Sequence, residues 1–254
     1  MEETVNTPGK SMEYDYFLNE FLPKIKNTPI INFMGGEPTL HPQFTDIFQN
    51  TYDSINPYTH LSVFTNGLMP NKVLDLMLGM AGPNGARNKN VTFAILLNWQ
   101  TLENISEKNH ERCKEVAEKM LRTNGYSVTF SINLYSKDQA LEKQCEEIDA
   151  IYQKVGLPKD KLYKIRVSPA FPIIGGEANV YLPIRDFPKV GRQMLKILQR
   201  FPQMCFRFDC SFPPCFLDEI EEDQLSLTDR FFFHGNKQLP PTEEWKNNDY
   251  YFGC

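Results

Sequence analysis

The chain has 254 residues, with 27 Lys and Arg against 32 Asp and Glu, a formal net charge of -5 and a hydrophobic fraction of 41%. This length suits one large domain, or a domain with a small appendage, and the apolar content excludes disorder throughout. The acidic balance argues against nucleic acid as a partner, and no apolar run approaches the ~20 residues that a membrane span needs.

The first ten residues are polar and acidic, and they lack the basic and apolar regions of a signal peptide. We therefore expect a cytoplasmic protein without membrane association. In that compartment the 6 cysteines are expected to be reduced thiols or metal ligands rather than disulfides.

Apolar runs alternate with helical patterns along most of the chain. In chain order, the pattern predicts a helix over 11–25, a strand over 29–34, a helix over 42–52, a strand over 61–64, a helix over 71–80, a loop over 82–89, a strand over 91–97, a helix over 107–123, a strand over 127–134, a helix over 137–155, a strand over 162–167, an irregular stretch over 168–183 and a helix over 185–200. Such alternation predicts βαβ units and a parallel sheet, in which ligands bind beyond the carboxyl ends of the strands.

The composition changes after Pro202, where Cys, Phe and Pro follow one another closely and an acidic helix is predicted over 217–229. We therefore divide the chain into an α/β domain over 1–202 and a small Cys-rich C-terminal extension over 203–254.

The most specific motif is Gly35-Gly36-Glu37-Pro38, extended by T-L-H-P, between a predicted strand and a predicted helix. The two glycines permit a sharp turn and a close approach of a ligand to the main chain, and Pro38 stiffens the turn. Glu37 adds an acceptor that can hold an ammonium group. On G-G-E alone, a glycine-rich connection with a surface glutamate is the alternative.

The full string resembles the second strand loop of the radical S-adenosylmethionine (SAM) superfamily, in which the G-G-E-P segment binds the methionine amino group of SAM. The resemblance covers about residues 11–200 and implies a partial (β/α)6 TIM-like barrel, here lacking its first strand. It further implies that Thr65 and Asn66, in a strand end followed by Gly67, and Ser131, Asn133 and Arg166 on later strands contact the cofactor.

Each of these secondary positions has an ordinary structural alternative. Thr65 and Asn66 are also typical of a turn that ends a strand, and Ser131 and Asn133 are also typical polar groups of a sheet. Arg166 suits the carboxylate of SAM, but a structural salt bridge is its alternative role.

The family's radical chemistry needs a [4Fe-4S] cluster held by three cysteines in a C-x3-C-x2-C loop after the first strand. No cysteine precedes Cys113 in this sequence, and Cys113 and Cys145 lie on predicted helices of the outer ring. We therefore expect this chain to be an N-terminally shortened copy of an enzyme that is inactive by itself. A cluster-less relative that keeps the fold for binding is the alternative.

Four later cysteines are candidate metal ligands: Cys205, Cys210, Cys215 and Cys254. Four thiolates can hold zinc or an auxiliary iron–sulfur cluster, and the segment is similar in place and content to the SPASM or twitch domains of the same superfamily. Its spacing lacks the usual C-x2-C pair, and buried thiols without a metal are the alternative.

The sequence thus predicts a radical SAM-type protein that, when intact, binds SAM and iron–sulfur clusters to modify a substrate, with a peptide or protein as the substrate class. The rival hypothesis is a module that binds SAM, a peptide or a partner protein without redox chemistry.

Overall fold

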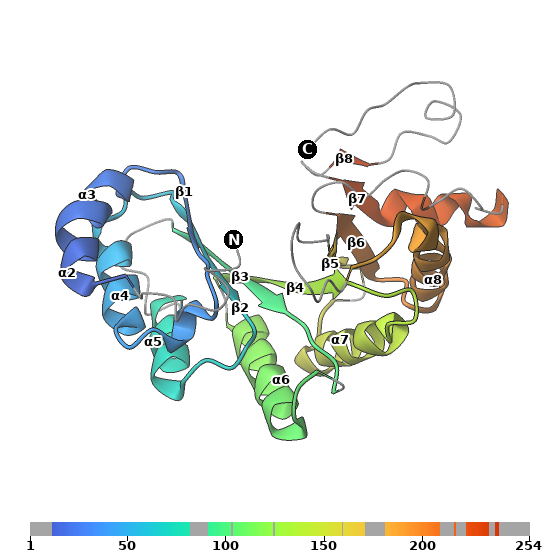
Figure 1. The fold of residues 1–254 in the computed structure, drawn as a ribbon, viewed down its shortest axis with the longest axis horizontal. Helices are drawn as coiled ribbons and strands as arrows, with labels where there is room; N and C mark the ends of the chain where they lie inside the picture. Colours follow the sequence, from blue (N-terminus) through green and yellow to red (C-terminus); the bar gives the residue numbers. More distant parts are fainter. Residues whose placement is uncertain are drawn as a thin grey trace. The chain divides into compact units, whose positions relative to one another are not determined.

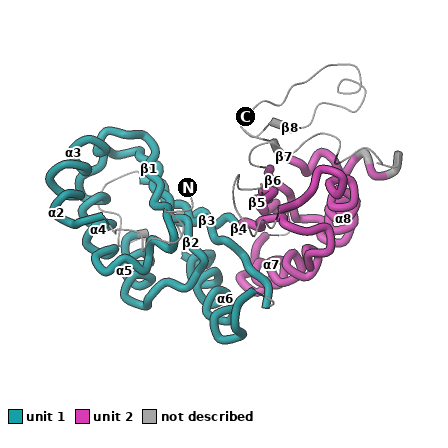
Figure 2. The backbone as a smooth tube through the Cα atoms, in the orientation of Figure 1, with its two compact units in different colours: residues 1–129 teal, residues 130–254 magenta. Residues whose placement is uncertain are grey.

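The computed structural model describes residues 12–81, 91–102, 104–123, 125–158, 160–170, 181–208, 216, 222–233 and 237–238. The chain divides into two compact units, residues 1–129 and 130–254 (Figure 2). Both units combine helices with parallel strands, so the chain has an α/β fold (Figure 1). The predicted barrel closure and the Cys-rich extension stay predictions.

The first unit is built on strands β1 (Ile30–Phe33), β2 (His60–Thr65) and β3 (Thr92–Asn98). These strands pair in sequence order and in parallel, and Asn32, Ser62 and Ala94 stand side by side in the register. Strand β4 (Tyr126–Leu134) begins in this unit and continues into the second. The order matches the prediction of βαβ units.

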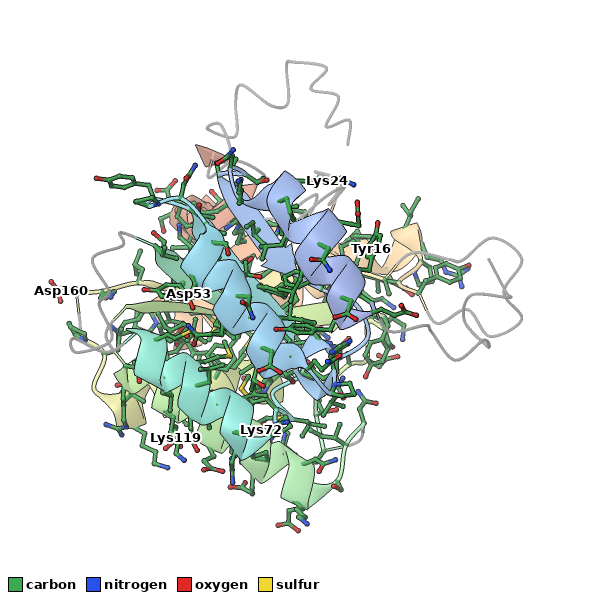
Figure 3. The ribbon with its side chains drawn as sticks, turned by 90° about the vertical axis from the view of Figure 1, so that its left-hand side faces the viewer. Tyr16, Lys24, Asp53, Lys72, Lys119 and Asp160 are labelled. Atoms are coloured by element: carbon green, nitrogen blue, oxygen red, sulfur yellow. The ribbon has the colours of Figure 1, made fainter. Side chains whose placement is uncertain are left out.

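The helical elements of the first unit agree closely with the predicted ranges. They are α2 (Tyr14–Tyr16), the π-helical turn η1 (Phe17–Phe21), α3 (Leu22–Ile25), the 3-10 turn η2 (Pro38–Leu40), α4 (Phe44–Ser54), α5 (Asn71–Ala81) and α6 (Glu107–Arg122). Figure 3 shows this helical layer from outside, with Tyr16, Asp53 and Lys72 marking successive helices.

One face of the first unit's sheet packs against the helices. The ring of Phe33 on β1 lies 5.6 Å from that of Phe44 and 5.4 Å from that of Phe48, both on α4. Tyr52 of the same helix stacks on Phe93 of β3 at 5.5 Å. Because side chains alternate along a strand, Asn32 and Ser62 point to the opposite face. That face is the one available for function.

The second unit contains the remaining strands and helices. They are the rest of β4, then α7 (Leu141–Val155), β5 (Tyr163–Pro169), the 3-10 turn η3 (Ile184–Asp186), α8 (Phe187–Arg200), β6 (Met204–Phe208), the 3-10 helix η5 (Glu222–Arg230), β7 (Phe231–Phe233) and β8 (Lys237–Gln238). Strands β4 to β7 pair in order and in parallel, whereas β8 is antiparallel to β7.

Aromatic side chains fill the space between this sheet and its helices. Tyr152 of α7 stacks on Tyr163 of β5 with ring centroids 4.2 Å apart, and it meets Phe130 of β4 edge-on at 5.7 Å. Helix α7 ends at Gly156, whose φ of 80° closes the helix in a left-handed conformation that favours glycine.

Several predicted elements of the second unit differ from the structure. Helix α7 was expected from Lys137 but begins at Leu141, because Gln139 stabilises a turn there by accepting from the Tyr135 amide and donating to the Asn133 carbonyl. Residues 204–208, which the sequence assigns to the extension, form β6 and continue the parallel strand order beside β5.

None of the helices in the described ranges is long and apolar enough to cross a membrane.

Candidate functional site

The loop that follows β1 is joined to the loop that follows β2 by the carboxylate of Glu37. Oε1 of Glu37 accepts from the amide and the hydroxyl of Thr39 and from the Thr65 hydroxyl at 2.8 Å. Oε2 accepts from the Asn66 amide at 2.6 Å. The predicted site residues Glu37, Thr65 and Asn66 therefore meet at the carboxyl ends of two neighbouring parallel strands.

The turn after β2 is further stabilised from within. The Thr65 hydroxyl accepts from the Gly67 amide at 3.1 Å, and the side-chain oxygen of Asn66 accepts from the Leu68 amide at 2.9 Å. Gly67 has a φ of 82°, a conformation that residues other than glycine rarely adopt. The Cys113 thiol of α6 donates to the Asn66 carbonyl at 3.0 Å and so supports the turn from behind.

Cys113 is a structural thiol in this arrangement. Burial raises its pKa to about 11, with the charge of Glu37 acting in the same direction and Arg112 opposing it. The thiol is thus kept protonated at neutral pH and able to donate to Asn66. Sequence reasoning placed Cys113 on an outer helix, which is confirmed, but gave it no role.

Gly35 and Gly36 are exposed, and a Cβ atom added to either glycine would meet nothing within 4 Å. Open space therefore lies beside the main chain of this turn, as the sequence predicts for a close ligand approach. Pro38 is half-buried and begins the 3-10 turn that carries Thr39 inward. The Glu37 carboxylate, predicted as an ammonium acceptor, uses four acceptor contacts within its own loops.

The second unit carries the other three predicted cofactor contacts on one face of its sheet. Ser131 and Arg166 are register partners on β4 and β5, and the Arg166 guanidinium donates to the Ser131 hydroxyl at 2.9 Å. Ser131 is buried, whereas Asn133 is exposed. Strand β5 extends to Pro169, so Arg166 lies in the middle of the strand rather than at its predicted end.

Three further polar residues lie on this face, of which Ser168 falls in the predicted strand end with Arg166, whereas Lys164 and Arg207 were not singled out from the sequence. Lys164 and Ser168 flank Arg166 at two-residue spacing on β5, and Arg207 is the register partner of Arg166 on β6. The alternation K-I-R-V-S is a period-2 signal that could have identified Lys164, whereas the mostly apolar sequence M-C-F-R-F gives no such signal for Arg207.

Of the four candidate metal cysteines, Cys205 is the one inside the described ranges. It is fully buried on β6, and burial raises its pKa although Arg230 and Lys164 oppose the shift. Cys210, Cys215 and Cys254 lie outside the described residues. Within the part of the chain that the structure describes, no group of three or more His, Cys, Asp or Glu side chains could hold a metal ion.

The structure is that of an α/β protein with polar side chains on its parallel strands. At the carboxyl ends of β1 and β2, hydrogen bonds from Glu37 connect two neighbouring loops. Such a loop pair can bind a small polar ligand through main-chain groups. No protein-family model, curated protein or solved structure matches the chain.

Proposed function

We propose that this chain binds S-adenosylmethionine, with the methionine end of the cofactor against the Gly35-Gly36 turn. The main support for the proposal is that Glu37 connects the G-G-E-P loop to the loop after β2 through hydrogen bonds to Thr65 and Asn66. Open space remains beside the two glycines of the first loop. A loop held in this way presents its main-chain groups in a fixed geometry at the carboxyl edge of the sheet.

Glu37 acts in this proposal as a positioning residue. Its carboxylate is shared among Thr39, Thr65 and Asn66, so the ammonium of the ligand is recognised by main-chain carbonyl groups of the turn. In the second unit, the contact to Ser131 fixes the direction of Arg166, and its guanidinium suits an anionic oxygen group.

The radical-generating [4Fe-4S] cluster does not fit the residues of this chain. A ligand loop of three cysteines is needed, yet no cysteine precedes Cys113, and Cys113 and Cys145 are buried on helices. Burial raises the pKa of both thiols, which opposes the thiolate form that iron requires. We therefore derive no radical step.

Calorimetric titration of the purified chain with SAM tests the proposal. Gly36→Val is the critical variant, because an added Cβ meets nothing within 4 Å and the larger side chain would occupy the space that the proposal gives to the ligand. The matched control is Gly79→Ala, on the exposed side of α5, where an added Cβ also meets nothing within 4 Å.

We expect SAM to bind the unaltered chain and the Gly79→Ala control alike, and we expect Gly36→Val to weaken binding at least about tenfold. Equal binding by the Gly36→Val variant, or no binding by the unaltered chain, would show that the glycine turn is not a SAM site. Urea unfolding of each variant checks that the fold is retained.

A further inference from the structure

A row of cationic side chains lies on one face of the second unit's sheet. Lys164 and Arg166 are on β5 and Arg207 is on β6, and all three are half-buried. Phe130 of β4 and Tyr163 of β5 contact Tyr152 of α7, so they point to the face of the sheet that this helix covers. Because side chains alternate along a strand, the cations point to the opposite face. We call these three residues the cation row.

The pairing register sets the cations close together. Arg166 and Arg207 are direct register partners on adjacent parallel strands, so their main chains are about 4.8 Å apart. Lys164 precedes Arg166 by two residues on the same face, a separation of about 6.6 Å. Guanidinium and ammonium donors at this spacing can bind one anionic oxygen group together.

The register neighbours of the cation row are neutral. Arg166 lies beside Ser131, Lys164 beside Cys205, and Arg207 beside Phe232. The ammonium of Lys164 lies over the ring of Phe232, 4.7 Å from its centroid. The face therefore combines cationic donors with an aromatic wall.

A neutral donor completes the arrangement at the carboxyl end of β5. The hydroxyl oxygen of Ser168 is buried and has no hydrogen-bond partner within the described part of the chain. Ser168 lies two residues after Arg166 on the same face, with Asn133 as its register partner. A buried hydroxyl without a partner is uncommon in folded proteins, and a bound ligand group would supply that partner.

We propose that the cation row and Ser168 bind an anionic oxygen group of the substrate, a carboxylate or a phosphate. Arginine binds both groups through two parallel hydrogen bonds, and lysine adds a point charge. Arg207, Lys164 and Ser168 carry this anion, and Arg166 adds a second guanidinium as the register partner of Arg207. By assigning that anion to the substrate, the inference rests on the proposed function and names its substrate class.

The test uses inorganic phosphate and succinate, titrated separately into the full chain by calorimetry at low ionic strength. We expect at least one probe to bind, and the probe that binds tells a phosphate substrate from a carboxylate one. Arg207→Gln and Lys164→Gln should each weaken binding about tenfold or more, while Arg207→Lys should retain most of the affinity.

Lys196→Gln on the exposed face of α8 is the matched control, because it removes the same charge away from the cation row. It should leave binding unchanged. Failure of both probes to bind the unaltered chain overturns the inference, and so does an equal loss in Lys196→Gln and Arg207→Gln, which would indicate general charge attraction only. If Arg207→Gln does not fold, Lys164→Gln and Arg207→Lys decide the question.

Titration of Arg207→Gln with SAM separates the two proposals. Unchanged SAM binding together with lost anion binding supports a separate anion site. If SAM binds and neither anion does, the inferred anion site fails while the proposed function stands. If the anions bind through Arg207 and SAM does not bind, the proposed function fails. The anion site then remains, but its anion is no longer assigned to a substrate.

Discussion

Replacement of Gly67 by alanine tests whether the turn after β2 is built as the structure shows it. The residue has a φ of 82°, and an added Cβ would lie 3.0 Å from Leu97 Cδ1, 3.1 Å from Cys113 Sγ and 3.3 Å from Cys113 Cα. The side-chain atoms can shift, but the Cα of Cys113 belongs to helix α6 and cannot move alone. Two separate penalties are therefore expected.

The first penalty is conformational, because an L-residue in the left-handed region costs about 1–2 kcal/mol. The second is overpacking, which costs about 1–3 kcal/mol in a well-packed interior. Together they predict that Gly67→Ala lowers the free energy of unfolding by about 2–5 kcal/mol. Neither penalty depends on a bound ligand.

Two other glycines separate these contributions. Gly156 has a φ of 80° but open space around its Cβ position, so its alanine variant should lose only the conformational part, about 1–2 kcal/mol. Gly79 lies within α5 with open space and ordinary φ, so its alanine variant should gain about 0.5–1 kcal/mol.

Urea unfolding followed by circular dichroism measures all three variants. From most to least stable, the expected order is Gly79→Ala, the unaltered chain, Gly156→Ala and Gly67→Ala. The free energy of unfolding should depend on urea concentration to a similar degree in all four proteins. If Gly67→Ala is no less stable than Gly156→Ala, the packing of Cys113 against this turn is wrong.

Three further variants or measurements probe the same framework. Glu37→Ala leaves the Asn66 amide without its acceptor and should cost about 2–3 kcal/mol in urea unfolding, with Glu37→Gln closer to the unaltered chain; equal losses would contradict the role of the carboxylate. Gly191→Ala would place a Cβ 1.8 Å from the Phe216 carbonyl oxygen and should lower the thermal midpoint by several degrees or more, and an unchanged midpoint would exclude this contact. The Cys113 thiol, with its pKa raised from 9.0 to about 11, should react with iodoacetamide at pH 8 about a hundredfold more slowly in the folded chain than in urea. The unfolded thiol ionises at a lower pH than the folded one, so the contribution of Cys113 to stability is complete below pH 9 and is lost as the pH rises toward 11. Rapid labelling of the thiol in the folded chain would contradict its burial.

Much of the α/β pattern could be predicted because it depends on local periodicity. The helix expected over 71–80 is Asn71–Ala81, and the strand expected over 91–97 is Thr92–Asn98. Each of these segments shows its period within a single window of residues. Its prediction requires no knowledge of the packing partner.

Strand β6 was not predicted, because its local sequence shows no clear period. Its sequence M-C-F-R-F is apolar at four of five positions, so the alternation that identifies a half-buried strand is hidden. The closely spaced Cys, Phe and Pro residues around it suggested a change of composition instead. Only the pairing with β5 reveals that this segment continues the sheet.

The role of Glu37 depends on partners that local sequence does not specify. The residue is separated by 28 positions from Thr65 and by 29 from Asn66, and the loops meet because β1 and β2 pair in a particular register. A one-residue change of that register would turn the side chains of β1 to the other face of the sheet. The motif predicts a ligand loop, whereas the pairing decides which groups of the loop remain for the ligand.

The same dependence on register distinguishes the two classes of candidate residue in the second unit. Cys205 and Arg207 are two residues apart on β6 and share one face of the sheet. Burial raises the pKa of the Cys205 thiol, which opposes the thiolate form that a metal requires, whereas Arg207 is half-buried as the register partner of Arg166. In the described part of β6, burial thus opposes metal ligation by Cys205, although Lys164 and Arg230 act in the other direction by lowering the pKa of its thiol, while the guanidinium of Arg207 suits an anion.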